Sequence, residues 1–518
     1  MRLCAVTAIA LAIASCSPTS AIPPAETSAP VKASFPAPAE TISGSPLTAS
    51  DERTATRPPA TTAAPTAPAQ PTATATPAVP ANAIVVNTFD QNVYPFKQNG
   101  NCSLGEAIWA AQTQQNEDGC VVSGGSTTIY LPKGTYTLSD PDTSSPPLAG
   151  AGGRLGFDPG GFPVIYTTVT ILGNGSTIQR KSSTPFAIFQ ATAQADLTLD
   201  DLTMTGGDTT YNPLLSGGAI DLEFGRVTLN HVVLTGNSSA SGGAIHSGGE
   251  LDINDSIIEG NQASTEGAGI DYSGIGFYFE GGSTHPGELH LKDSQIIKNV
   301  GTDKDGTLGG GIYAQGGQVT IDHSLIQGNN AAEGAGLYDE GGTVNVLDGS
   351  VFSGNVATEV SATPHGGGGI NGLAIGGEHV LVTIQDSYVV DNQAPESIAG
   401  AIFVQPSDDD PSSVVLTISH SVIAGNVAEV GGGIVAGGKG SVTNSCLMNN
   451  KSTEPTAGSG ADIDGVVTAA NNWWGTGGVP SVSSDVATSP LLTSPPDICA
   501  PGAVTPYPTS TPAASPTP

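Results

Sequence analysis

A repeating pair of short motifs runs through the middle of the chain and restricts the folds that it can adopt. One motif is of the Gly-Gly-Ala-Ile type, in which small residues precede Ile or Leu. The other is an alternating apolar stretch that ends on asparagine, as in LDINDSIIEGN and LTISHSVIAGN. The terminal asparagines are 24 to 38 residues apart and comprise Asn237, Asn261, Asn299, Asn329, Asn355, Asn392, Asn426 and Asn450. A repeat of this length is typical of a solenoid.

The shortest interval, 24 residues, fits one coil of a β-helix, and longer intervals fit the same coil with an inserted loop. Strands with a period of two place alternate apolar residues, such as Leu251 and Ile253, inside each coil. Glycine and asparagine suit the corners, where left-handed backbone conformations are needed. One coil cannot bury its apolar side alone, so neighbouring coils must stack. The sequence therefore predicts an all-β fold, a single-stranded right-handed parallel β-helix of about ten coils.

Composition agrees with this fold and limits the possible partners. The chain has 69 glycines and only 12% charged residues, which is unusual for a helical protein because glycine is costly in helix interiors. Its net charge of −32 repels nucleic acids and anionic lipid headgroups. No nucleic-acid partner is therefore predicted.

Proline, alanine, threonine and serine dominate residues 17–82 and 500–518, which cannot bury a core and are expected to be a disordered spacer and tail. The folded region between them divides into an N-terminal cap, 83–125, and the β-helix, 126–499. Within the cap, one helix is predicted over Glu106–Gln115. The first strands of the β-helix are expected within 126–138 and 167–178.

The first 16 residues resemble a bacterial lipoprotein signal peptide. Arg2 precedes a short apolar run that ends in Ile13-Ala14-Ser15-Cys16, similar to a lipobox. Lipidation of Cys16 would anchor an exported chain at the cell surface, with no other membrane attachment. The alternative is ordinary cleavage after Thr19-Ser20-Ala21, which would release the chain into the medium.

Four cysteines remain once Cys4 and Cys16 are set aside: Cys102, Cys120, Cys446 and Cys499. An even number in an exported chain predicts two disulfides. Of the three possible connectivities we favour Cys102–Cys120 with Cys446–Cys499, because each pair lies near one end of the folded region.

Three further features resemble known families. The segment from Cys102 to Ile108 is similar to the Cys-Ser-Leu-Arg-Glu-Ala motif of secreted bacterial β-helix proteins, with Gly105 in place of the arginine. The repeats are similar to those of chlamydial polymorphic membrane proteins, which are surface adhesins. Asn471-Asn472-Trp473-Trp474-Gly475 resembles the last coil of pectate-lyase-like proteins. These resemblances imply the fold more strongly than they imply a function.

Aligning the repeats produces a column of residues that directly follow each Ile or Leu, and that should point outward if the Ile points inward. The column comprises Asp221, His246, Asp271, Tyr313, Tyr338, Asn371, Phe403 and Val435. Its acidic members and histidine could form a polar cluster, and its aromatic rings a stacking platform for sugars. The alternative is a sheet face whose aromatic side chains pack on one another.

A second column suggests metal ligands, but its residue types are equally those of turns. It comprises Asp201, His231, Asp255, Asp293, His323, Asp386, His420 and Asn444. We interpret it as a row of corner residues. No metal site or cofactor is predicted, and no specific motif supports calcium.

The sequence leaves two classes of function open. The first is binding or adhesion of a monomeric protein to a polysaccharide or cell-surface ligand, through an exposed sheet face and inserted loops. The second is a carbohydrate-active enzyme, either a polysaccharide lyase or a polygalacturonase-like hydrolase. Hydrolysis needs two carboxylates several ångströms apart. Asp221 and Asp271, two coils apart at ~4.8 Å per coil, lie near the upper end of that range.

Overall fold

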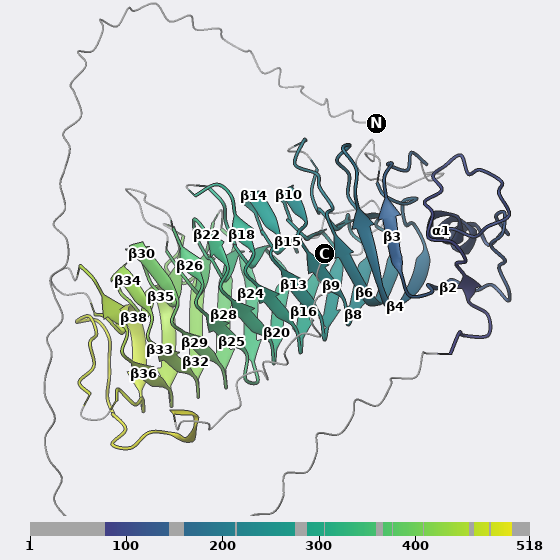
Figure 1. Ribbon diagram of the computed structural model, residues 1–518. Helices are drawn as coiled ribbons and strands as arrows, with labels where there is room; N and C mark the ends of the chain where they lie inside the picture. The colour runs from purple at the N-terminus through teal and green to yellow at the C-terminus, as the bar shows by residue number, and fades with distance from the viewer. Residues whose placement is uncertain are drawn as a thin grey trace, which may run out of the picture. The chain divides into compact units, whose positions relative to one another are not determined.

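The chain divides into two units, Met1–Ala73 and Thr74–Pro518, and only the second contains described residues. The computed structural model describes residues 78–144, 160–212, 215–274, 287–304, 306–358, 366–375, 377–407, 409–454, 460–475 and 478–499. Cys16, most of the spacer and the tail therefore lie outside the described residues. Within the second unit, strands of successive coils pair in parallel to form a right-handed parallel β-helix, as predicted (Figure 1).

Each regular coil contributes strands to four ladders, A to D, in chain order. Ladder A has ten rungs among the described residues: β5 (Phe189–Ala191), β7 (Ile220–Leu222), β11 (Ile245–Ser247), β15 (Ile270–Ser273), β19 (Ile312–Gln315), β23 (Leu337–Glu340), β27 (Ile370–Leu373), β31 (Ile402–Gln405) and the first residues of β35 (Ile434–Thr443) and β38 (Ile463–Ala470). Ladder B comprises β2 (Thr128–Tyr130), β4 (Thr168–Arg180), β6 (Asp196–Thr205), β8 (Arg226–Asn230), β12 (Glu250–Asn254), β16 (Glu288–Lys292), β20 (Gln318–Asp322), β24 (Gly342–Leu347), β28 (Val380–Gln385), β32 (Val414–Ser419) and the last residues of β35 and β38.

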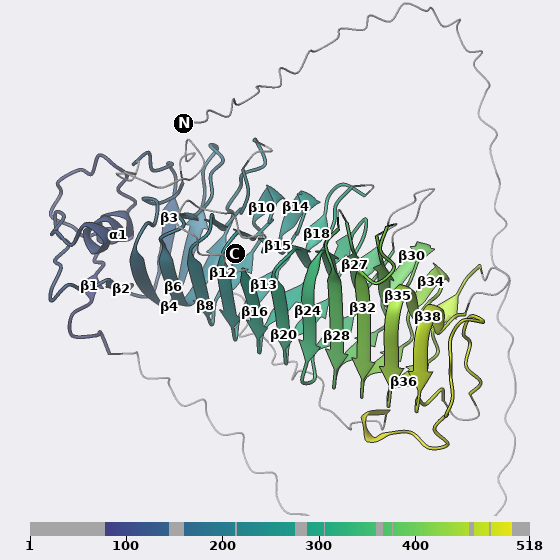
Figure 2. The ribbon, with the colours of Figure 1, turned by 180° about the vertical axis from the view of Figure 1, so that it is seen from behind.

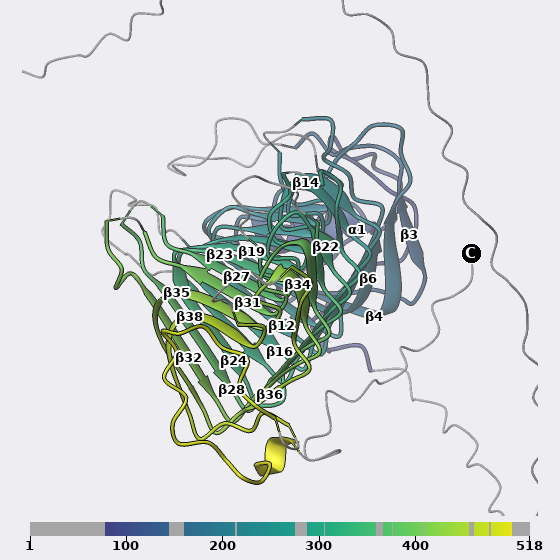
Figure 3. The same cartoon turned by 90° about the vertical axis from the view of Figure 1, so that its left-hand side faces the viewer.

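Ladders C and D complete the coil (Figure 3). Ladder C comprises β3 (Thr135–Leu138), the ends of β4 and β6, β9 (Val233–Thr235), β13 (Ile257–Glu259), β17 (Gln295–Ile297), β21 (Leu325–Gln327), β25 (Val351–Ser353), β29 (Tyr388–Val390), β33 (Val422–Ala424) and β36 (Cys446–Met448). Ladder D comprises β10 (Ser238–Ser241), β14 (Gln262–Glu266), β18 (Val300–Gly301), β22 (Asn330–Ala331), β26 (Val356–Ala357), β30 (Gln393–Ile398), β34 (Val427–Val430) and β37 (Lys451–Ser452). Alternate side chains along these strands, such as Leu251 and Ile253, are fully buried in one continuous apolar core.

The corner between ladders B and C is made by the second column of the sequence. All eight of its residues have φ between 43° and 53°, the left-handed region that Asp, Asn and His tolerate better than most side chains. The interpretation of these residues as corner residues is therefore confirmed.

The terminal asparagines of the repeat do not adopt the left-handed conformation that we expected of corner residues. The residue before each of them does, with φ between 54° and 69°, as at Gly236, Lys298 and Asp391. The asparagines instead stack into a ladder, and the side chains of its members from Asn237 to Asn426 are buried. Each one from Asn237 to Asn426 donates from its backbone and side-chain amides to Oδ1 of the next, at 2.9–3.2 Å.

The N-terminal cap contains β1 (Ile84–Val85) and α1 (Leu104–Thr113), two residues earlier than the predicted helix. The helix begins there because Ser103 and Glu106 form a capping box. The fully buried Glu106 side chain also accepts a hydrogen bond from Asn92 Nδ2 at 2.7 Å. A Cβ at Gly105 would lie 2.8 Å from the carbonyl oxygen of Asn92, so this position has no room for the arginine of the related motif.

Both predicted disulfides are present. Cys102–Cys120 joins the start of α1 to the loop after it, with a Cα separation of 4.6 Å. Cys446–Cys499 ties β36 to η1 (Asp497–Cys499), with a Cα separation of 5.8 Å. Two disulfides indicate an oxidising, extracytoplasmic compartment.

Candidate functional site

The outward column of ladder A exists as predicted from the repeats. Asp221, His246 and Asp271 are register partners in successive coils, followed by Tyr313, Tyr338, Asn371, Phe403 and Val435. Because the residues before them are fully buried in the core, the side chains of the column point away from it.

The aromatic part of this column forms the packed sheet face that the sequence left open as the alternative to an exposed platform. Tyr313, Tyr338 and Phe403 are only 3–4% exposed, and Asp271 and Asn371 are buried as well. The two tyrosine rings stack on each other, with centroids 5.7 Å apart. An exposed stacking platform is therefore not formed.

The segment that leads into each ladder A strand lies close to this column. The first glycine of the repeat motif, as at Gly334, turns with positive φ and lies against the outward residue four positions later. A Cβ at Gly334 would be 2.7 Å from Cβ of Tyr338. At Gly367 it would be 2.9 Å from Cβ of Asn371. The turn thus packs against the base of these side chains.

The first part of the column belongs to a polar cluster, which also includes two glutamates that the repeats do not mark. His246 Nδ1 lies 2.7 Å from Asp271 Oδ2, and Tyr313 donates its hydroxyl to Glu340 Oε2 at 2.6 Å. Glu266, from the end of β14, lies beside them, and burial together with the carboxylate of Asp271 raises its pKa. Since Glu266 and Glu340 come from outside the aligned column, only their spatial proximity identifies them.

Metal binding receives no support from the described residues, which bring together no group of three His, Cys, Asp or Glu side chains able to hold an ion. At the B–C corner, histidines pair with carboxylates instead. His323 Nδ1 lies 2.7 Å from Asp293 Oδ1, and His420 contacts Asp386 in the same way.

The strands of ladder B lie side by side along the solenoid (Figure 2), and their outward residues are half-buried or exposed. Its central row consists mainly of hydroxyl-bearing residues in strict register. The row comprises Thr128, Thr170, Thr198, Thr228, Asp252, His290, Thr320, Asn345, Thr383, Thr417, Ser441 and Thr468. Nothing in the repeat motifs marks this row, because threonine outside a sheet core is an ordinary strand residue.

Ladder B divides into a charged half and an uncharged half. In the first, Arg226 contacts Glu250 at 2.7 Å and Asp252 at 3.0 Å, and His290 contacts Glu288. From β24 onward, the outward residues are uncharged except Lys439. We call this part the hydroxyl face; it comprises Thr343, Asn345, Leu347, Leu381, Thr383, Gln385, Val415, Thr417, Ser419, Ser441, Thr443, Thr468 and Ala470.

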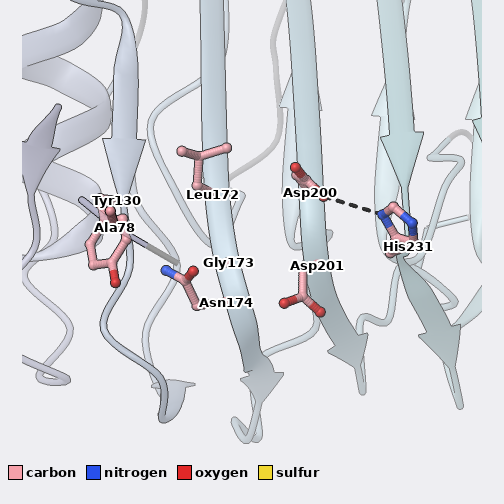
Figure 4. A pocket seen from close by; sticks show the side chains of 8 residues that line it. All are labelled: Ala78, Tyr130, Leu172, Gly173, Asn174, Asp200, Asp201 and His231. Carbon is pink, nitrogen blue, oxygen red and sulfur yellow. Dashed lines mark ion pairs between the residues drawn. The ribbon is translucent and has the colours of Figure 1, made fainter. Parts of the chain in front are cut away.

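A pocket of about 420 Å³ lies at the B–C corner of the first coils (Figure 4). We call it the corner groove; besides Ala78 and Gly173, its lining residues are Tyr130, Leu172, Asn174, Asp200, Asp201 and His231. Two of them, Asp201 and His231, were assigned to the second column from the sequence, whereas Tyr130 and Leu172 had no assigned role.

No protein-family model matches this chain, and neither curated proteins nor solved structures gave a match. The described residues also include no helix of the length and apolar character needed to span a bilayer.

Proposed function

We propose that this protein is an exported, surface-attached adhesin that binds neutral polysaccharide through the hydroxyl face. The observation that carries the proposal is a regularly spaced sheet face whose outward residues include one charged side chain, Lys439, on a chain whose net charge is −32. The lipobox-like segment that ends at Cys16 supports attachment at the cell surface.

The side chains of the hydroxyl face suit the chemistry of sugars. Its central row offers hydroxyl and amide groups at Asn345, Thr383 and Thr417, one for each rung spacing of ~4.8 Å. Beside them, the exposed and paired Leu381 and Val415 provide an aliphatic strip. Hydroxyls can donate and accept hydrogen bonds, and aliphatic carbon can pack against the C–H groups of a sugar ring.

Charge selects among the possible occupants of this face. A second copy of the chain would bring two strongly acidic molecules together, and an acidic polysaccharide would be repelled in the same way. A neutral polymer meets no such repulsion and can lie across several rungs at once. A neutral polysaccharide is therefore the occupant that fits.

The test measures depletion of the purified protein from solution by insoluble cellulose, chitin and β-1,3-glucan. A double variant, Thr383→Asp with Thr417→Asp, places two carboxylates in the central row. We expect at least one of these polymers to bind the parent protein, and the double variant to bind it at least tenfold more weakly.

The matched control is Thr198→Asp with Thr228→Asp, which makes the same change in the same row but in the charged half. It should bind as the parent does, and all three proteins should unfold at similar temperatures. Absence of binding to every neutral polymer, or an equal loss in the control, would rule out the hydroxyl face as the binding site.

Hydrolysis of a polysaccharide is a second candidate, favoured by the cluster around Glu266. A carboxyl group whose pKa is raised can serve as a general acid, and Asp271 is a neighbouring carboxylate. Release of reducing ends from the same polymers, abolished by Glu266→Gln, would support this function. Equal release by the parent and the variant would exclude Glu266.

A further inference from the structure

The corner groove combines groups of two kinds in an ordered row. Tyr130, Leu172 and Asp200 are register partners in three successive coils, so the groove runs across the strands. Asn174, Asp201 and His231 form a second row at the corner, each with φ near 52°. A ligand lying along the groove would meet a new pair of side chains at each rung.

One end of the groove is apolar and the other is polar. Figure 4 shows Tyr130 beside Ala78 at one end, and Asp200, Asp201 and His231 toward the other. His231 Nδ1 lies 3.5 Å from Asp200 Oδ1. A pyranose ring has the matching character, because its C–H groups pack against apolar side chains such as Leu172 and its hydroxyls donate to carboxylates.

One polar group of the groove, the Asn174 side chain, is held in place by the backbone. Asn174 donates from Nδ2 to the carbonyl oxygen of Leu131 at 2.7 Å, which fixes its side chain against the preceding coil. A Cβ at Gly173 would lie 2.4 Å from the carbonyl oxygen of Asp201, so this glycine permits the close approach of the two corners. Groups that are positioned before binding lose little freedom when a ligand arrives.

We propose that the corner groove binds a neutral oligosaccharide, with one sugar ring against the half-buried Leu172 and hydroxyl groups on Asp200 and Asp201. Its volume of about 420 Å³ lies within the usual range for small-molecule sites. Two carboxylates on an acidic protein disfavour an anionic sugar. This site is separate from the hydroxyl face and does not depend on it.

The test uses the folded protein and three soluble probes, cellohexaose, chitohexaose and laminarihexaose, with binding followed by saturation-transfer NMR and titration calorimetry. The variant Asp200→Asn with Asp201→Asn removes both charges while keeping residue types that tolerate the corner. We expect at least one probe to bind the parent protein and to bind the variant at least tenfold more weakly.

Two controls separate this proposal from the proposed function. Asp255→Asn makes the same change at an exposed corner outside the groove and should leave binding of the hexasaccharide unchanged. The Thr383→Asp, Thr417→Asp variant should also retain it, even if it no longer binds insoluble polymer. Failure of all three probes, unchanged binding by the groove variant, or tighter binding of oligogalacturonate would overturn the proposal.

Discussion

The side-chain amide of Asn329 donates to Oδ1 of Asn355 at 3.0 Å, and the backbone N–H of Asn329 donates to the same oxygen at 3.0 Å. Asn299 makes the same two hydrogen bonds to Asn329. Each oxygen of the ladder therefore satisfies two donors of the previous coil in a corner that water does not reach. One substitution within the ladder should affect two coil junctions.

We predict that Asn329→Leu lowers the free energy of unfolding by about 3–5 kcal/mol, because it leaves both donors of Asn299 without an acceptor. Chemical denaturation, followed by circular dichroism, measures the change. Asn254→Ala, which removes a hydrogen bond to Asn230 on the outward side of ladder B, should cost less than about 1 kcal/mol. Similar losses in the two variants would contradict a structural role for the ladder.

We predict that Tyr313→Ala and Tyr338→Ala each destabilise the fold by about 3–5 kcal/mol, since both rings are buried and stacked. Polysaccharide binding by the remaining folded protein should not change. Thermal unfolding and the depletion assay provide the two measurements. Loss of binding at full stability would instead restore these rings as a binding platform.

Asp339 is a buried carboxyl group in the interior of β23, and burial raises its pKa to about 7. The register partners of Asp339 in the coils on either side are Ala314 and Gly372, which offer no polar side chain. Neither carboxyl oxygen of Asp339 accepts a hydrogen bond. Tyr272 occupies the same register position two coils away. The charge of Glu340 raises the pKa of Asp339 further. The folded state therefore holds this proton more tightly than the unfolded state does.

The stabilisation from this proton is complete below about pH 4 and is lost as pH rises through 7. Because the pKa of Asp339 is about three units higher in the folded state, this proton stabilises the folded state by about 4 kcal/mol. We predict that Asp339→Asn gains stability relative to the parent protein between pH 4.5 and pH 8.5. Denaturation at the two pH values measures this, and parallel pH profiles for parent and Asp339→Asn would contradict it.

Gly105 offers a test of the cap. Gly105→Arg restores the residue of the related motif, but its Cβ would lie 2.8 Å from the carbonyl oxygen of Asn92. We predict a loss of about 1–3 kcal/mol from this overlap. Arginine at the exposed Gln115 should be tolerated. Equal melting temperatures for the two variants would show that the loop at Asn92 moves aside.

Much of the fold could be predicted because its causes are local. The spacing of the asparagines sets the coil length, period-two strands set which side chains enter the core, and Asp, Asn or His mark the corner between ladders B and C. Cysteine count and position were enough to choose Cys102–Cys120 and Cys446–Cys499. The register of the outward column, from Asp221 to Val435, also follows from the repeat alone.

The tertiary structure decided which outward side chains are exposed and which residues lie close together. Alternation shows that Tyr338 points outward, but only the folded chain shows that it is buried and stacked on Tyr313. Tyr313 and Glu340 are 27 residues apart in the sequence and meet only because successive coils stack. Loops of unequal length separate Asn345, Thr383 and Thr417 in the sequence. Only the stacking of the coils brings them into the single row of the hydroxyl face. Sequence periodicity determines the direction of a side chain, whereas solvent access depends on what packs above it.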